Sequence, residues 1–349
     1  MIAHGRRPVE IIGGGLAGLS LGIFLLRRGV PVCVQEAGFY PRHRVCGEFL
    51  SPRDPFFLEK CGLGKLMAGC ADGRGSSVVW EWPGRAGSKF QLKHPAWRVS
   101  RYRLDFCLAE QLQKAGGRLE VGRRVELEQW EGRDGVVLAT GRRRCAEGGW
   151  VGLKLHARGL ETRADLEMLC GRGAYVGLCR VGEDIVNISG LFRTRTAVGG
   201  KWRGLIFLLQ KHGLERLAER VARAQPVEGS FCAVSHLDFR LPRSGGATVC
   251  RLGDAFGMIA PLSGNGMSVA LESAWLAQDA LAAYSENRLS WREACLAVST
   301  KLRRAFVRRM FFAVACQQMV LSGSLRPALA AAAASGLLPW RGLHAALGR

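Results

Sequence analysis

The first forty residues contain two apolar runs separated by a glycine-rich break, and this pattern predicts a strand, a turn, a helix and a second strand. The first strand ends before Gly13. A helix is expected from Leu16, because leucine and isoleucine recur at helical spacing after it, and Gly29 stops it. The second strand ends at an acidic residue, Glu36. This order of elements is that of a βαβ unit in a parallel sheet.

Gly13, Gly15 and Gly18 have the G-x-G-x-x-G spacing of a dinucleotide-binding turn. One glycine allows the tight turn, one allows close approach of a pyrophosphate to the backbone, and one allows the helix to pack on the sheet. Glu36 lies 18 residues after Gly18, where a carboxylate accepts hydrogen bonds from both hydroxyls of an adenosine ribose. An ordinary glycine loop is the simpler alternative, but the flanking elements and the acid favour a site for FAD or NAD over NADP.

A second glycine-rich signal lies over residues 249–281, where a strand ends at Gly253 and Asp254 and a helix starts after a loop. Asp254 is placed to hydrogen-bond the ribityl chain of a flavin, and the alternative is a turn or cap residue. Backbone N–H groups over residues 263–266 and the helix dipole would stabilise negative charge on a flavin ring.

Three further segments alternate like the strands of a second sheet, over residues 150–160, 184–193 and 230–242. Two apolar stretches near the C-terminus, residues 310–321 and 328–340, are each shorter than the roughly 20 residues that span a bilayer. We expect packed terminal helices there. The alternative is an interfacial patch in which Arg303, Arg304, Arg308 and Arg309 meet lipid head groups.

The 349 residues carry 50 Lys and Arg against 29 Asp and Glu, a formal charge of +21. This charge has two explanations: an arginine-rich proteome, or a partner that is an anionic membrane surface, an acidic carrier protein or an acidic substrate. Nucleic acid is not expected, because no recognition motif accompanies the charge. Clusters of basic residues lie at Arg142 to Arg144 and along 303–309.

Twelve cysteines are dispersed without a C-x-x-C pair or a Cys/His cluster, so we expect neither a metal site nor a disulfide framework. A cytoplasmic protein with optional peripheral membrane contact is the simplest expectation. Arg6 and Arg7 precede an apolar run, but this run holds the nucleotide glycines and Glu10, so an export signal is not expected.

Four blocks of the chain together resemble the FAD-dependent oxidoreductase superfamily of geranylgeranyl reductases, p-hydroxybenzoate hydroxylase-type monooxygenases and flavin-dependent halogenases. The blocks are GGGLAG with Glu36, PRHRVCGEFLSP at 41–52, VSRYRLDFCLAEQLQKAGG at 99–117 and GDAFGMIAPLSGNGM at 253–267. The resemblance covers most of the chain. It implies an α/β fold, in which a Rossmann-type FAD-binding domain carries an inserted β-sheet substrate domain and C-terminal helices.

The expected boundaries make the FAD-binding domain discontinuous. It takes residues 1–75, 98–141 and 245–290, the substrate domain takes 76–97 and 142–244, and the C-terminal helical region takes 291–349. The expected cofactor-binding residues are Gly13, Gly15, Gly18, Glu36, Arg42, Arg101, Asp254, Pro261, Gly264, Asn265, Gly266 and Met267. The role of Arg101 comes from the resemblance alone, whereas Arg42 and Arg44 would neutralise pyrophosphate or merely be solvated.

Cys46 and Glu48 belong to a Cys-Gly-Glu loop that resembles the loop near the isoalloxazine in geranylgeranyl reductases. A thiol there tunes the flavin or donates a proton, and a carboxylate acts as acid or base if burial raises its pKa. The alternatives are a small buried hydrophobe and a cap. Lys154, with His156 on the same strand, is a candidate substrate contact or an exposed strand lysine.

The leading expectation is an FAD-dependent monooxygenase that hydroxylates a hydrophobic aromatic substrate, a phenolic lipid or polyketide that is free or carrier-bound, through a flavin C4a-hydroperoxide. The alternative is a reductase of carbon–carbon double bonds, although the Tyr-x-Trp-x-Phe-Pro motif of that branch is missing and residues 173–181 stand in its place. Halogenation is a minor option, because Trp80-Glu81-Trp82-Pro83 only approaches the halogenase motif. A flavin-retaining electron carrier is the non-enzymatic alternative. No second nucleotide fingerprint follows, so NAD(P)H is expected to bind transiently as electron donor, or a partner reduces the flavin.

Overall fold

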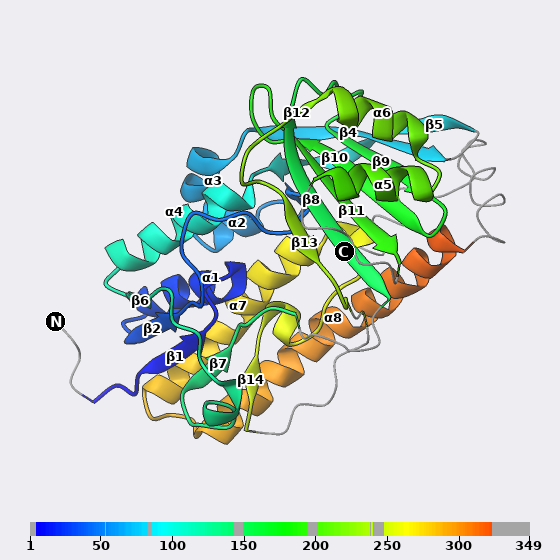
Figure 1. Cartoon of the computed structure of the whole chain (residues 1–349). Coiled ribbons are helices and arrows are strands. Elements are labelled where there is room, and N and C mark those ends of the chain that lie inside the picture. Colours follow the sequence, from blue (N-terminus) through cyan, green and yellow to red (C-terminus); the bar gives the residue numbers. More distant parts are fainter. Residues whose placement is uncertain are drawn as a thin grey trace.

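The computed structural model describes residues 5–52, 54–82, 85–142, 149–194, 202–237, 239 and 248–322. Two β-sheets form the frame of the molecule (Figure 1). The smaller sheet and its helices take the lower left of this view, and the larger sheet takes the upper right. The expected α/β architecture, with a parallel nucleotide-type sheet, a larger sheet and C-terminal helices, is confirmed.

Among the described residues, the smaller sheet is parallel and has five strands in the order β14-β7-β1-β2-β6. Its strands are β1 (Val9–Ile12), β2 (Val32–Gln35), β6 (Arg118–Glu120), β7 (Val136–Leu138) and β14 (Cys250–Arg251). The chain thus returns to this sheet from three distant segments. Because all five strands run the same way, the loops after β1, β2 and β14 emerge at one edge of the sheet, which is where ligands bind in such folds.

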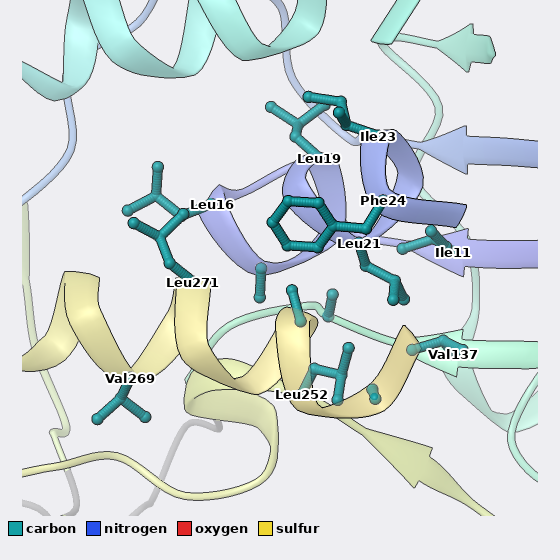
Figure 2. Close-up of a cluster of buried hydrophobic side chains, with 14 of the residues drawn as sticks. Ile11, Leu16, Leu19, Leu21, Ile23, Phe24, Val137, Leu252, Val269 and Leu271 are labelled. Atoms are coloured by element: carbon teal, nitrogen blue, oxygen red, sulfur yellow. The ribbon is translucent and has the colours of Figure 1, made fainter. Parts of the chain in front are cut away.

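Helix α1 (Leu16–Leu26) begins at the glycine turn and is buried from Leu16 to Leu25. A helix that is apolar on every side needs cover on every side. The sheet covers one side, while α4 (Arg101–Lys114) and α7 (Gly266–Ser285) cover the others. In Figure 2, Phe24 and Leu271 lie toward the space between α1 and α7, whereas Leu19 and Ile23 point to the other side of α1. This packing holds the glycine turn in place.

The larger sheet has the strand order β12-β8-β11-β10-β9-β4-β5-β3, and β13 also pairs with β8. These strands are β3 (Phe49–Leu50), β4 (Arg74–Trp82), β5 (Arg85–Arg98), β8 (Trp150–Arg158), β9 (Leu166–Gly171), β10 (Ala174–Arg180), β11 (Val186–Arg193), β12 (Gln225–Pro226) and β13 (Cys232–Val234). The three segments that the sequence predicts as strands of this sheet therefore contain β8, β11 and β13. Strand β3 joins it from the N-terminal third of the chain.

Helices α5 (Arg203–Lys211) and α6 (Glu215–Arg223) cover one face of the larger sheet (Figure 1). Leu153 and Leu155 of β8 point into this covered face and join its core. Alternate residues of a strand point to opposite faces, so Gly152, Lys154 and His156 point toward the other face. That other face looks onto the smaller sheet and its loops.

The remaining short elements are α2 (Phe57–Lys60), α3 (Gly64–Cys70) and the 3-10 turns η1 (Leu127–Gln129), η2 (Gly253–Ala255) and η3 (Pro261–Ser263). The strand before Asp254 ends at Arg251, earlier than the sequence suggests, and Asp254 lies in η2. The second helix start is confirmed, because α7 begins at Gly266.

Helix α8 (Trp291–Leu321) is 31 residues long and contacts elements of both sheets (Figure 1). A capping box between Ser290 and Glu293 starts it. It contains the first of the two apolar C-terminal stretches, and the second lies outside the described residues. Arg309 does not belong to an exposed basic patch, because it is buried and pairs with Glu272 at 2.7 Å. Within the described ranges, no helix is both long and apolar enough to cross a membrane.

Candidate functional site

A cavity of about 1370 Å³ lies between the two sheets. Single small-molecule pockets typically measure about 300–1,000 Å³, so this cavity has room for more than one ligand. Its polar end is formed by the loops after β1, β2 and β14, and its apolar end by the open face of the larger sheet and by the end of α8. The expected site residues outside the larger sheet line this space, except Gly18, which is buried in α1.

The glycine turn lies at the polar end, and its three glycines do different work. A Cβ on Gly18 would lie 2.0 Å from the carbonyl oxygen of Gly13, and a Cβ on Gly13 would lie 2.4 Å from the carbonyl oxygen of Ala139. Gly13 also has φ +110°, which side chains rarely adopt. A Cβ on Gly15 would meet no heavy atom within 4 Å, because Gly15 faces the cavity at the start of α1. The turn is therefore closed toward the protein and open toward a ligand.

Glu36 follows β2 and its carboxylate is buried at the edge of the cavity. One oxygen accepts from the backbone N–H of Gly14, and the other from that of Gly38, each at 2.9 Å. Arg42 and Arg44 also reach this carboxylate, at 2.6 and 3.3 Å. The acid is held firmly at the position where a ribose is recognised in such folds. Arg42 is thus next to the nucleotide loop rather than in bulk solvent.

Arg101 lies in the first turn of α4 and lines the cavity. Its guanidinium donates two hydrogen bonds to the buried carboxylate of Asp105, at 2.7 and 2.8 Å. Arg44 donates to Asp105 from the other side at 3.1 Å and so bridges Asp105 and Glu36. Burial lowers the pKa of Arg101, but the Asp105 carboxylate more than reverses this and raises it above the ordinary arginine value. A permanent positive charge therefore faces the cavity.

Asp254 and the start of α7 form the opposite wall of the polar end. Pro261, Gly264, Asn265, Gly266 and Met267 all line the cavity there. A Cβ on Gly266 would meet no heavy atom within 4 Å, so the N-terminus of α7 is open to the cavity. Burial raises the pKa of Asp254, and the charges of Arg101 and Arg142 counter part of that rise. Two helix N-termini thus point their N–H groups into one cavity.

These N–H donors and carboxylate acceptors fit FAD. The open N-terminus of α1 suits a pyrophosphate, Glu36 suits an adenosine ribose, and Asp254 suits the hydroxyls of a ribityl chain. The N-terminus of α7 would stabilise negative charge on a reduced flavin ring. The backbone at Gly15 and Gly266 is accessible to the cofactor, because these glycines leave open the space that a Cβ would fill.

The Cys-Gly-Glu loop, residues 46–48, lies in the cavity wall between its two ends. Glu48 has φ 57°, in the left-handed region that favours glycine, and its side chain is fully buried. One carboxylate oxygen contacts Nε2 of His156 at 2.6 Å, and the other contacts Nζ of Lys154 at 3.5 Å. The backbone N–H of Arg101 donates to this second oxygen at 2.9 Å.

The thiol of Cys46 and the carboxyl group of Glu48 differ in their protonation states. Burial raises the pKa of the Cys46 thiol, and the charge of Arg101 only partly offsets the rise. Burial would also raise the pKa of Glu48, but the hydrogen bond with His156 and the charge of Lys154 bring it below its ordinary value. At neutral pH the loop thus carries a protonated thiol and an ionised carboxylate.

The surroundings of Lys154 differ from both roles considered from the sequence, a substrate contact and an exposed strand lysine. It is fully buried, so it is not an exposed strand lysine, and it is not among the residues that line the cavity. It lies behind Glu48, and its Nζ is 2.7 Å from Nδ1 of His43. Burial lowers the pKa of its ammonium group, against the charge of Glu48.

A family profile described as "FAD binding domain" matches residues 6–144. This segment contains the glycine turn, Glu36, the Cys-Gly-Glu loop and Arg101. This match agrees with the superfamily resemblance of the sequence motifs, and FAD is the cofactor that the cavity fits.

Comparisons with individual proteins agree on the fold. The "Menaquinone reductase" of Mycobacterium tuberculosis is 29% identical over 121 residues, which are 33% of this chain and 28% of the relative. The match therefore spans less than a third of the relative's length. Among solved structures, the flavin-dependent brominase Bmp2 has a TM-score of 0.77 at 16% identity, covering 97% of this chain and 93% of the other. A geranylgeranyl bacteriochlorophyll reductase-like protein from Thermoplasma acidophilum has a TM-score of 0.70 at 17% identity, covering 90% and 87%.

Sequence reasoning missed several residues that shape this flavoprotein's site. Tyr40 donates to the carbonyl of Gly14 within the glycine turn. Asp105 orients Arg101, and its i,i+4 spacing from that arginine on a helix is a signal that was available. His43 lines the cavity, but nothing in the chain order places it beside Lys154. Those contacts arise only when the larger sheet closes over the loop.

Proposed function

We propose that this FAD-dependent oxidoreductase binds a hydrophobic aromatic substrate and hydroxylates it with molecular oxygen. The observation that carries the proposal is the apolar end of the cavity, which is continuous with the flavin cradle. Trp80, Trp82 and Tyr175 give this end an aromatic wall, and Met168 and Leu191 fill the space between them. Such a wall suits a flat, electron-rich ring.

FAD supplies the oxygen chemistry when it is bound. The chain's own part is to hold the ring and exclude water from it. Trp80 and Trp82 stack with ring centroids 6.0 Å apart on β4 and present one apolar surface. Their strand is paired to β9 and β5, so the surface is rigid. This arrangement supports orientation of the substrate without a charged contact.

Reduction of a carbon–carbon double bond is the second candidate, and Cys46 is the observation that favours it. Its thiol stays protonated and lies in the cavity wall, so it is a proton source near the flavin end. The similarity to a menaquinone reductase over the FAD-binding part agrees with this chemistry. In this reaction the Cys46 thiol would donate a proton to one carbon of the double bond, and reduced FAD would supply the hydride for the other carbon.

The electron donor is proposed to be NAD(P)H, bound transiently. The described residues contain one βαβ unit with a nucleotide-type glycine turn, and FAD takes that site. A nicotinamide would then approach the cavity only for the reduction step. Reduction of the flavin by a partner protein is the alternative, and failure of both NADPH and NADH to reduce the FAD-loaded protein would support it.

Oxygen labelling tests the proposal. The FAD-loaded protein is incubated with NADPH or NADH and a phenolic lipid, either under ¹⁸O₂ or without oxygen, and products are analysed by mass spectrometry. One ¹⁸O atom in the product supports hydroxylation. Turnover without oxygen, together with transfer of deuterium from reduced flavin, rejects hydroxylation and supports the reductase. Oxidation of the flavin only by a partner protein would reject both.

A further inference from the structure

The buried carboxylate of Glu48 joins two parts of the molecule that are far apart in the chain. On one side it accepts from the backbone N–H of Arg101 at 2.9 Å and from the hydroxyl of Ser100 at 3.4 Å, at the start of α4. On the other side it contacts Lys154 and His156 of β8. One side chain therefore links the FAD-binding domain to the larger sheet.

The two β8 partners reach Glu48 because they alternate along one strand. Lys154 and His156 point to the same face of the larger sheet, opposite to Leu153 and Leu155. Both are buried. A third residue of this face, Asn187, is paired with His156 in the sheet and donates to the carbonyl of Cys46 at 2.9 Å. The sheet thus holds both ends of the 46–48 loop.

The loop also needs this support because of its backbone. Glu48 adopts φ 57°, a conformation that costs energy for a residue with a side chain. Its carbonyl accepts from Val99 at 3.0 Å, and its own N–H points at the Cys46 sulfur at 3.4 Å. Without the carboxylate contacts, little in these interactions would keep a non-glycine residue in the left-handed region.

We infer that Glu48, supported by Lys154 and His156, is a positioning unit that holds Cys46 and Arg101 in the cavity wall, and that its carboxylate exchanges no proton with the substrate. Both of its carboxylate oxygens are engaged, one by Arg101 and Lys154 and the other by His156, and the ionised state described above agrees with this role. The inference deepens the proposed function and rests on it only for the effect on turnover. It replaces the acid–base role that the sequence suggests for Glu48.

The test uses Glu48→Gln, which keeps the side-chain shape but cannot accept from both sides. The matched control is Glu167→Gln. Glu167 is also fully buried and ion-paired, to Arg163 and Arg220, but it does not line the cavity. Both variants are purified with FAD, and thermal unfolding measures how much each loses in general stability.

The first readout needs no substrate. Iodoacetamide alkylation of Cys46 is followed by peptide mass spectrometry, and the visible circular dichroism of bound FAD is recorded. We expect Glu48→Gln to be alkylated at Cys46 at least about tenfold faster than wild type, because the loop opens more often, and to change the flavin bands. Glu167→Gln should match wild type in both. Unchanged reactivity and bands in Glu48→Gln would overturn the inference, whatever the reaction proves to be.

The second readout is turnover. A positioning role predicts a fall in kcat of about a hundredfold with little change in KM and with the same apparent pKa values in the pH–rate profile. Loss of one limb of that profile would instead make Glu48 an acid or base and reject the inference. Lys154→Met serves if Glu48→Gln does not fold, and it is expected to show the same alkylation and spectral changes.

Discussion

The hydroxyl of Tyr175 on β10 donates to Oε1 of Gln317 on α8 at 3.1 Å, and both side chains are buried. This hydrogen bond joins the larger sheet to the helix that closes the apolar end of the cavity. Tyr175 also lines the cavity, so the bond fixes one wall of the space in which we propose the substrate binds. Tyr175 and Gln317, which are separated by 142 positions in the chain, thus define one edge of that wall.

Tyr175→Phe is expected to lower the free energy of unfolding by about 1–3 kcal/mol, because the buried amide of Gln317 loses its donor. The double variant Tyr175→Phe with Gln317→Leu should recover much of this loss, since no buried polar group then stays unpaired. Urea unfolding of the three proteins measures both values. A single variant as stable as wild type would mean that the bond does not hold α8 on the sheet.

The same change from glycine to alanine is expected to have different effects at two positions of the glycine turn. Gly18→Ala should destabilise the protein by about 1–3 kcal/mol, because its Cβ would lie 2.0 Å from the Gly13 carbonyl oxygen. Gly15→Ala should leave the stability of the apoprotein nearly unchanged but weaken FAD binding, because its methyl group enters only the cavity. Thermal unfolding of apoprotein and fluorescence titration with FAD separate the two effects. Equal FAD affinity in Gly15→Ala and wild type would place the pyrophosphate elsewhere.

His43 makes stability depend on pH. Burial, followed by the charges of Lys154 and His156, lowers the pKa of His43 from 6.5 to about 4, with Glu48 acting in the opposite direction. Between these two values the unfolded chain binds a proton that the folded chain does not bind, so stability falls as pH falls through this range. Above pH 6.5 the contribution of His43 is constant.

His43→Phe removes this titration but keeps a ring against Tyr102, on which His43 stacks at 4.5 Å. We expect the melting temperature of the variant to fall less than that of wild type between pH 6.5 and about 4. Carboxylates titrate in both proteins, so the difference between the two curves isolates the histidine. Parallel curves would show that His43 is not held neutral in the folded state.

Asp105→Asn tests the support of Arg101. The substitution leaves a buried guanidinium with a neutral partner, which typically costs about 3–5 kcal/mol, and FAD affinity should fall because Arg101 loses its bidentate orientation. Added FAD should raise the melting temperature of the variant, since a ligand that binds only the folded state stabilises it.

The control is Arg103→Gln on the same helix. Arg103 pairs with Asp72 at 3.0 Å, and its side chain is half exposed. Pairs at the surface contribute about 0–1 kcal/mol, so this variant should behave like wild type in both stability and FAD affinity. If Asp105→Asn were no worse than the control, the Arg101–Asp105 pair would have no special part in the cofactor site.

The cofactor end of the site was predictable because the residues that form it lie close together in short segments of the chain. A glycine turn, a helix and a strand-terminal acid act through backbone geometry and local hydrogen bonds, and residues 13–36 contain all of them. The start of α7 was predictable for the same reason. Arg101 needed the superfamily resemblance, because a helix N-terminus by itself does not say which cavity its side chain faces.

The wall of the cavity and the state of its charged groups were not predictable in this way. Lys154 lies in a segment with the alternating pattern of an ordinary strand, yet tertiary packing buries it completely and places it next to Glu48. The pKa of Glu48 follows from that neighbour and from His156, 108 residues away. Arg309 likewise belongs to a basic run in the sequence, but the packing of α8 on α7 pairs it with Glu272.

The amino-acid sequence by itself determined the strand–turn–helix–strand unit and the glycine-marked start of α7, because these depend on local periodicity and on glycines that no side chain can replace. The tertiary structure decided which polar groups meet in the interior, which of them keep a charge, and how α8 completes the apolar end of the cavity. Burial and long-range pairing set those properties, and both arise only when distant segments pack together.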